Sequence, residues 1–183
     1  METFVLVEGE SDRVALHTLA RRLGRDLERE GVEVVDLAGA TNVGRWLEDL
    51  AATGARPTLA GLYDAPEERF FRRGLERGGR GPVPDRARLE ELGFFACEPD
   101  LEHELIRALG EDAVEAVIEA QGELPSLRIL QHQPAQREQS TVQHLHRFIG
   151  VRSGRKSLYA QRLVEALDLD RVPTPLVRVL SRV

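Results

Sequence analysis

The sequence predicts an α/β fold in which a mainly parallel four-stranded sheet is flanked by helices and followed by a helical C-terminal extension. Two observations predict it. Over the first hundred residues, apolar runs of strand length alternate with segments of helical periodicity, which is typical of a parallel sheet covered on both faces. Beyond about residue 100 the pattern becomes helical. We therefore divide the 183 residues into an α/β core at 1–110 and a mildly basic helical part at 111–183 that packs on it.

The predicted elements follow one another as short segments. Strands are expected at residues 3–7, 32–37, 57–63 and 92–97. Thr41 or Asn42 is expected to cap the second helix, and the first helix is expected to carry apolar side chains as far as Leu27. Further helices are expected at 67–77, 101–109, 112–121, 141–149, 156–167 and after Pro173. Connectors are expected at the Gly- and Pro-rich stretch 78–84 and at the polar stretch 131–140.

The composition excludes several classes of protein. No apolar run approaches the ~20 residues of a membrane-spanning helix, and no signal-type segment precedes the first strand. Cys97 is the only cysteine, so no intrachain disulfide can form and a reducing compartment is indicated. We therefore expect a cytoplasmic protein without a membrane partner.

Charge is unevenly distributed along the chain. Residues 1–123 carry 15 basic and 27 acidic side chains, whereas residues 124–183 carry 10 basic and 4 acidic ones. A basic C-terminal third favours a partner that carries phosphates, although chance would also produce such an imbalance. Of the 25 basic residues only Lys156 is a lysine. Either this position needs a compact ammonium whose pKa can move, or the lysine was kept by chance in a chain that otherwise uses arginine.

Acidic side chains follow three of the four predicted strands: Glu8 the first, Asp64 the third, and the group 98–104 the fourth. Because the carboxyl ends of parallel strands share one edge of a sheet, these acids would converge there. Clustered carboxylates repel one another unless cations neutralise them, and Mg²⁺ or Mn²⁺ prefers oxygen ligands. Two such ions ~4 Å apart would suit phosphodiester hydrolysis. A plain helix-dipole role is the alternative for three acids in first helical turns, Asp12, Glu67 and Glu68.

The motif Val7-Glu8-Gly9-x-x-Asp12 after a strand, with a later strand that ends at Asp64, resembles the Toprim domain of topoisomerases, primases and OLD-family nucleases. With Asp100-Leu101-Glu102 and Lys156 added, the chain is most similar to the OLD-family Toprim nuclease module. The resemblance implies a Toprim-like fold and metal ligation by Glu8, Asp12, Asp64 and Asp100 or Glu102. It also implies a catalytic role for Glu8 and for Lys156, whose ammonium would neutralise the scissile phosphate.

The sequence departs from the family pattern at Asp64-Ala65-Pro66, where Pro66 replaces the second acid of the Asp-x-Asp motif. Proline cannot ligate a metal, so Glu67 or Glu68 becomes the candidate substitute ligand from the first helical turn. The phosphate-binding motif Gly-x-x-x-x-Gly-Lys-Ser/Thr is missing from the sequence. We therefore expect a stand-alone Toprim protein without the OLD ATPase domain.

Weaker signals lie in the basic part of the chain. Phosphate binding is predicted for three cations that precede or open a helix, with a plain basic loop as the alternative: Arg152, Arg155 and Lys156. Three histidines are expected at the surface or in capping roles: His132, His144 and His146.

We expect this protein to hydrolyse phosphodiester bonds in nucleic acid with Mg²⁺ or Mn²⁺, and DNA is favoured over RNA as the substrate. A Toprim module that lacks full chemistry and binds nucleic acid or a partner ATPase is the first alternative. Nucleotidyl transfer is the second, although the sequence shows no sign of a nucleotide pocket. Topoisomerase activity is not expected, because no strand-passage domain is present and Tyr63 and Tyr159 are the only tyrosines.

Overall fold

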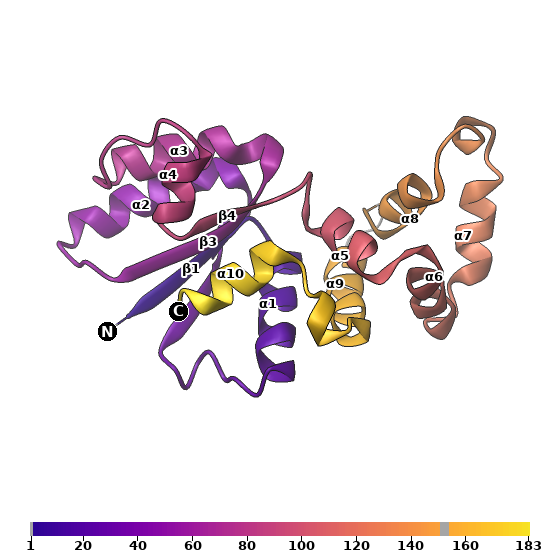
Figure 1. The fold of residues 1–183 in the computed structure, drawn as a ribbon. Helices are drawn as coiled ribbons and strands as arrows, with labels where there is room; N and C mark the ends of the chain where they lie inside the picture. The colour runs from indigo at the N-terminus through magenta and orange to yellow at the C-terminus, as the bar shows by residue number, and fades with distance from the viewer. Residues whose placement is uncertain (1, 151–153) are drawn as a thin grey trace.

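The computed structural model describes residues 2–150 and 154–183 and shows one four-stranded parallel sheet (Figure 1). Its strands are β1 (Thr3–Val7), β2 (Val32–Asp36), β3 (Thr58–Asp64) and β4 (Phe94–Cys97). They lie in the order β2-β1-β3-β4, and each neighbouring pair is parallel. The predicted α/β fold class is therefore confirmed.

Helices cover both faces of the sheet (Figure 1). One face carries α2 (Val43–Ala52), α3 (Glu68–Arg77) and α4 (Arg86–Glu91). The other face carries α1 (Glu10–Arg22), which connects β1 to β2, and α10 (Thr174–Ser181) from the end of the chain. Such coverage explains why the strands are apolar on both sides.

The side chains of the strands alternate between two apolar cores. Val5 and Val7 of β1 belong to the core beneath α1, whereas Leu6 belongs to the core beneath α2 and α3. Phe95 and Phe94 of β4 divide in the same way. Because successive side chains point to opposite faces, both faces of each strand are covered by helices. Polar groups are therefore placed at the carboxyl ends of the strands.

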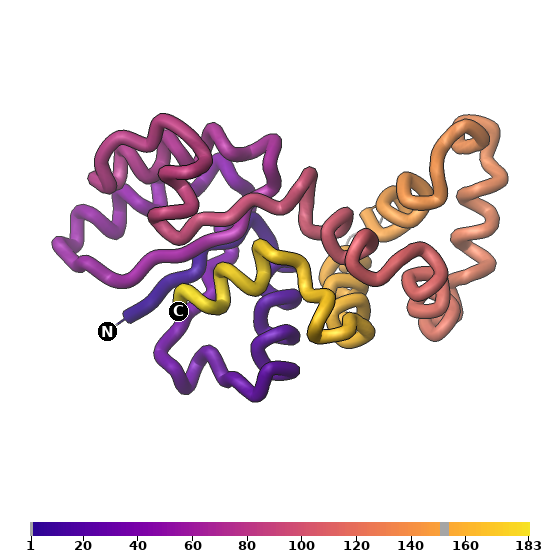
Figure 2. Tube along the Cα trace, viewed as in Figure 1, coloured from indigo at the N-terminus to yellow at the C-terminus, as the bar shows by residue number. Residues whose placement is uncertain are grey.

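The C-terminal part of the chain is helical. It contains α5 (Leu101–Leu109), α6 (Glu111–Ala120), α7 (Leu124–Gln131), α8 (Thr141–Gly150) and α9 (Arg155–Ala166) before α10. Figure 2 shows how the chain moves away from the sheet through these helices and then returns to it with α10. One apolar core joins side chains of β1 and α1 to side chains of α5 through α10, so it runs through both parts expected at 1–110 and 111–183.

Two arginines attach the last helices to the region of α1. Arg22 donates from Nη1 to the carbonyl oxygens of Val164 and Leu167, at 2.7 and 2.6 Å. Arg25 donates to the carbonyl oxygens of Leu180 and Val183, at 2.6 and 2.8 Å. These guanidinium groups bond carbonyls at helix C-termini, where the last carbonyls have few backbone partners. They thereby set the position of α9, whose first turn carries Lys156.

Three details of the predicted elements were wrong. The first helix ends at Arg22, so Leu27 lies in the loop that follows the helix, although its side chain is buried. Asn42 does precede α2, but its side chain donates to the carbonyls of Leu37 and Ala38 and makes no cap. Two short helices, α4 and α7, are additional to the predicted ones. In the described part of the chain, no helix has both the length and the apolar character needed to cross a membrane.

Candidate functional site

The site is built at the carboxyl edge of the two central strands. Glu8 follows β1 directly, and Asp64 is the last residue of β3, which is the neighbour of β1. The Glu8 carboxylate accepts a hydrogen bond from the backbone N–H of Asp64, with Oε1 and N 2.8 Å apart. The structure therefore brings together the first two acids that the sequence predicts at this edge.

Asp12 joins them from the first turn of α1. Its Oδ2 accepts a hydrogen bond from the N–H of Gly9 at 3.0 Å, so it closes the beginning of the helix over the end of β1. Its side chain does act at the helix N-terminus, as the alternative interpretation holds, but only 8% of the residue is exposed. Burying an ionised carboxylate is costly, so a cap alone does not account for this position.

Glu102 completes the group from the first turn of α5. It is 3% exposed, and its Oε2 accepts a hydrogen bond from Nζ of Lys156 at 3.2 Å. Its other oxygen, Oε1, is buried without a hydrogen-bond partner among the residues that the structure describes. Buried acceptors nearly always have a partner, so this oxygen fits a role in binding a cation or a ligand donor. We call Glu8, Asp12, Asp64 and Glu102 the carboxylate cluster.

Burial and mutual repulsion disfavour negative charge in this cluster. Burial raises the pKa of Glu8 to about 7, and Glu67 and Glu102 add to the effect. Burial and the nearby Glu102 raise the pKa of Asp12 to about 7. Burial, followed by Glu8 and Asp12, raises the pKa of Asp64 to about 8. Near neutral pH the cluster therefore holds protons that a bound cation would displace.

Lys156 is the one described cation that forms an ion pair with the carboxylate cluster. Burial acts to lower its pKa, but Glu102 and the other acids outweigh burial and raise the pKa above its ordinary value. Its side chain remains 47% exposed, so the ammonium faces both Glu102 and solvent. It can therefore contact a ligand that approaches this edge of the sheet.

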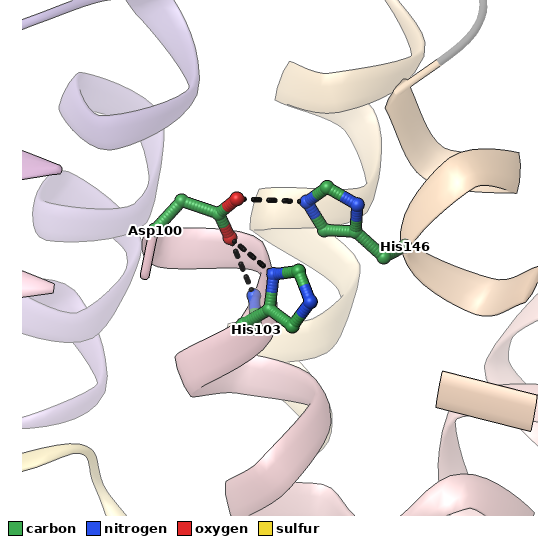
Figure 3. Close-up of side chains that lie close together, drawn as sticks. All are labelled: Asp100, His103 and His146. Atoms are coloured by element: carbon green, nitrogen blue, oxygen red, sulfur yellow. Dashed lines mark hydrogen bonds and ion pairs between the residues drawn. The ribbon is translucent and has the colours of Figure 1, made fainter. Parts of the chain in front are cut away.

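A second group of polar side chains lies beside the cluster (Figure 3). Asp100 caps α5: its Oδ1 accepts from the backbone N–H of His103 at 2.9 Å and lies 2.8 Å from Nδ1 of the same residue. Its Oδ2 lies 2.8 Å from Nε2 of His146, which comes from α8. Burial alone would raise the pKa of Asp100, but the hydrogen bonds from His146 and His103 outweigh it and hold the pKa well below its ordinary value.

Comparisons with known proteins support the fold described above. Residues 2–60 match the family described as overcoming lysogenization defect protein-like, TOPRIM domain, a range that includes Glu8 and Asp12. The C-terminal region of the Xanthomonas campestris pv. campestris OLD protein, in a structure phased with iodine, superposes with a TM-score of 0.70. The match covers 98% of this chain and 92% of that one, at 23% sequence identity. The chain has an OLD-like Toprim fold.

A second solved structure supports the same assignment. The C-terminal region of the Burkholderia pseudomallei OLD protein matches with a TM-score of 0.68 and 22% identity, over 98% of this chain and 95% of that one. No curated protein matches the sequence. The resemblance that the sequence predicts is thus confirmed for the fold, since the family match covers residues 2–60 and the solved structures are less than 25% identical to this chain.

Within this OLD-like Toprim fold, the two proposed substitute ligands differ. Glu67 lies close enough to Glu8 to contribute to its raised pKa. Glu68 instead accepts a hydrogen bond from Nε of Arg86 at 2.8 Å. Because a guanidinium already engages the carboxylate of Glu68, Glu67 is the better placed of the two, and both stay predictions. Pro66 lies in the short 3₁₀ turn after β3, where its missing N–H causes no loss.

Arg155 and Lys156 are neighbours in the sequence but have different surroundings. Arg155 is buried, donates to the carbonyl of Phe148 at 3.1 Å, and pairs with Glu123 at 2.6 Å. Its guanidinium also lies over the Phe148 ring. These contacts contradict the predicted phosphate-binding role of Arg155, because the group is occupied inside the protein. The same prediction for Arg152 falls outside the described residues.

The histidines also correct the sequence analysis. His144 is buried and donates from Nε2 to the carbonyl of Gln136 at 2.8 Å, so it is not a surface residue. His146 is only partly exposed and lies against Asp100. His103 was missed altogether. The spacing Asp100-x-x-His103 at the start of a helix was the available signal, because it places the two side chains on one helical turn.

Proposed function

We propose that the carboxylate cluster binds Mg²⁺ or Mn²⁺ and that this protein is a metal-dependent phosphodiesterase that acts on nucleic acid, with DNA preferred over RNA. One observation carries the proposal: four carboxylates from three segments lie close enough together at one edge to raise the pKa of three of them, and one buried oxygen of Glu102 has no partner among the described residues. The all-oxygen donor set suits hard dications. The resemblance to OLD-family Toprim nucleases supports the same reaction.

Each residue has a separate part in this proposal. Glu8, Asp12, Asp64 and Glu102 would hold the metal, which when bound supplies Lewis-acid stabilisation of a phosphodiester and lowers the pKa of water. Lys156 would stabilise the negative charge that develops on the phosphate, because its ammonium is half-exposed beside Glu102. Glu8, with a pKa raised to about 7 by burial, would exchange a proton near neutral pH.

The proposal is tested by incubating purified protein with supercoiled plasmid and with single-stranded DNA and RNA, in Mg²⁺, Mn²⁺ or chelator. We expect the wild type to cleave DNA only with metal. Glu8→Gln should lose at least ~100-fold in rate, because it removes one charged ligand. Glu10→Gln is the matched control, since Glu10 lies in the same turn but pairs with Arg13 at the surface. Equal rates for wild type and Glu8→Gln would contradict the proposal.

A second function is favoured by one observation, the presence of Pro66 where an acid would add a ligand. In that case the protein is a Toprim module without cleavage activity that binds nucleic acid or a partner ATPase. Calorimetric titration with Mn²⁺ separates the two. Binding at tens of micromolar or tighter supports the phosphodiesterase, whereas DNA binding without Mn²⁺ binding supports the module.

A further inference from the structure

We propose that Asp100, His103 and His146 form a second metal site, which takes a transition-metal dication of the Zn²⁺ type. The site goes beyond the proposed function, because it uses imidazole nitrogens from α5 and α8 and none of the four residues of the carboxylate cluster. Figure 3 shows both rings turned toward the carboxylate of Asp100. The ring of His103 comes from α5, which Asp100 caps, and the ring of His146 comes from the neighbouring helix α8.

The geometry needs little adjustment to hold an ion. One ligand atom from each residue can be chosen so that all three lie within 4.8 Å of one another. In a tetrahedral Zn²⁺ site the ligand atoms lie roughly 2.0–2.2 Å from the ion and hence ~3.4 Å from each other. Small rotations of the side chains would therefore close the site. The remaining coordination position would be left for water or a phosphate oxygen.

The protein already orients the three ligands. The backbone N–H of His103 fixes Oδ1 of Asp100, and this bond survives if the imidazoles turn to a metal. The two rings lie 3.9 Å apart between centroids, at 36° to one another, so each restricts the other. Support of ligands by a second layer of hydrogen bonds is typical of metal sites. All three side chains are partly exposed, so an ion can enter from solvent.

The ligand set exceeds what an ion pair requires. A single imidazolium would neutralise the Asp100 carboxylate, and two imidazolium rings in such close contact would repel each other. A dication bound by two neutral imidazoles and one carboxylate accounts for all three side chains. Nitrogen donors also favour Zn²⁺, Co²⁺ or Ni²⁺ over Mg²⁺. The two neighbouring sites would therefore select different metals.

The test is calorimetric titration of metal-free protein with Zn²⁺, together with Co²⁺ titration followed by visible absorption. We compare the wild type with His103→Gln, His146→Gln and the control His132→Gln, whose histidine lies exposed on another helix end. The wild type and His132→Gln should bind one Zn²⁺ that excess Mg²⁺ does not displace. Each of the other two variants should bind at least tenfold more weakly.

Failure of this proposal can be told apart from failure of the proposed function. Glu8→Gln should bind Zn²⁺ as well as the wild type does, even though it loses cleavage activity. X-ray absorption of Zn²⁺-loaded Glu8→Gln should show imidazole scattering, and this reading does not depend on the folding of the histidine variants. An oxygen-only coordination shell, unchanged Zn²⁺ affinity in His146→Gln, or no Zn²⁺ binding by the wild type at ~100 μM would each overturn the second site.

Discussion

Two groups of polar side chains lie beside each other at the edge of the sheet, and they differ in how the charge of their acidic residues is balanced. In the carboxylate cluster, burial and repulsion raise the pKa of Glu8, Asp12 and Asp64. Beside it, hydrogen bonds from two imidazoles hold the pKa of Asp100 below its ordinary value despite burial. Among the described residues, the four carboxylates of the first group have the ammonium of Lys156 as their counter-charge, whereas the single carboxylate of the second group is bonded by two imidazoles.

The same contrast separates Arg155 from Lys156. Arg155 is 7% exposed at its side chain and is engaged by Glu123 and Phe148, whereas Lys156 is half-exposed and, within the described residues, forms an ion pair with Glu102 alone. A charge that is balanced inside the protein contributes to folding. A charge that is left incompletely balanced is available to a ligand, and it reduces stability until the ligand binds.

The largest effect that this contrast predicts is on catalysis. Lys156→Ala should lower the rate of metal-dependent DNA cleavage by ~10²–10³-fold, because one preorganised positive charge at the phosphate is lost. Mn²⁺ affinity, measured by calorimetry, should stay the same or increase, since Glu102 loses a competing cation. Arg162→Ala on the same helix, where Arg162 pairs with Glu165 at the surface, should leave the rate unchanged. A Lys156→Ala variant that cleaves DNA at the wild-type rate would contradict the claim that Lys156 is available to a ligand.

The next effect is on folding. Arg155→Met leaves the carboxylate of Glu123 without its buried cation and should lower the free energy of unfolding by about 3 kcal/mol. The melting temperature should fall by about 6–12 °C in a chain of this length. Arg13→Met, which removes an exposed pair with Glu10, should cost less than about 1 kcal/mol. Thermal unfolding of the three proteins measures both values, and equal losses would show that burial does not distinguish these pairs.

The stability of the metal-free protein should depend on pH. Glu8, Asp12 and Asp64 keep protons in the folded state up to pH 7–8, whereas the unfolded chain releases them near pH 4. Stability should therefore fall as pH rises from 5.5 to 8.5, by about 2 kcal/mol or ~5 °C in melting temperature. His146, whose pKa the Asp100 carboxylate raises, acts in the same direction.

Scanning calorimetry in chelator checks this slope. Asp64→Asn should flatten it, because the amide cannot ionise, and 10 mM Mg²⁺ should recover most of the stability at pH 8.5. A melting temperature that rises over this pH range would contradict the assignment of raised pKa values to the cluster.

The smallest effect concerns metal affinity. Mn²⁺ must displace protons from carboxylates whose pKa lies at about 7 to 8, so its affinity should rise at least ~tenfold between pH 6 and pH 8. Calorimetric titrations at the two pH values, in buffers of different ionisation enthalpy, give both the affinity and the number of protons released. Affinity independent of pH, with no proton release, would show that the cluster is already ionised.

Much of this arrangement could be predicted from the sequence. The apolar strand before Glu8, and the later strand that ends at Asp64, sufficed to place both acids at one edge because parallel strands share a direction. The short helix α4 was missed because six residues after a Gly- and Pro-rich stretch give no clear period. His146 was missed as a partner of Asp100 because 46 residues separate the two, and no local spacing reports such a contact.

By itself, the sequence determined the alternation of strands and helices, the acids at the strand ends and the single lysine. Only the tertiary structure decided which charged side chains are buried and which are paired. Adjacent residues of a helix point about 100° apart, so Arg155 of α9 is enclosed against Phe148 of α8 and Glu123 at the start of α7, whereas Lys156 is left at the edge beside Glu102. The strength of a charge interaction depends on distance and on exclusion of water, and both are properties of the folded chain.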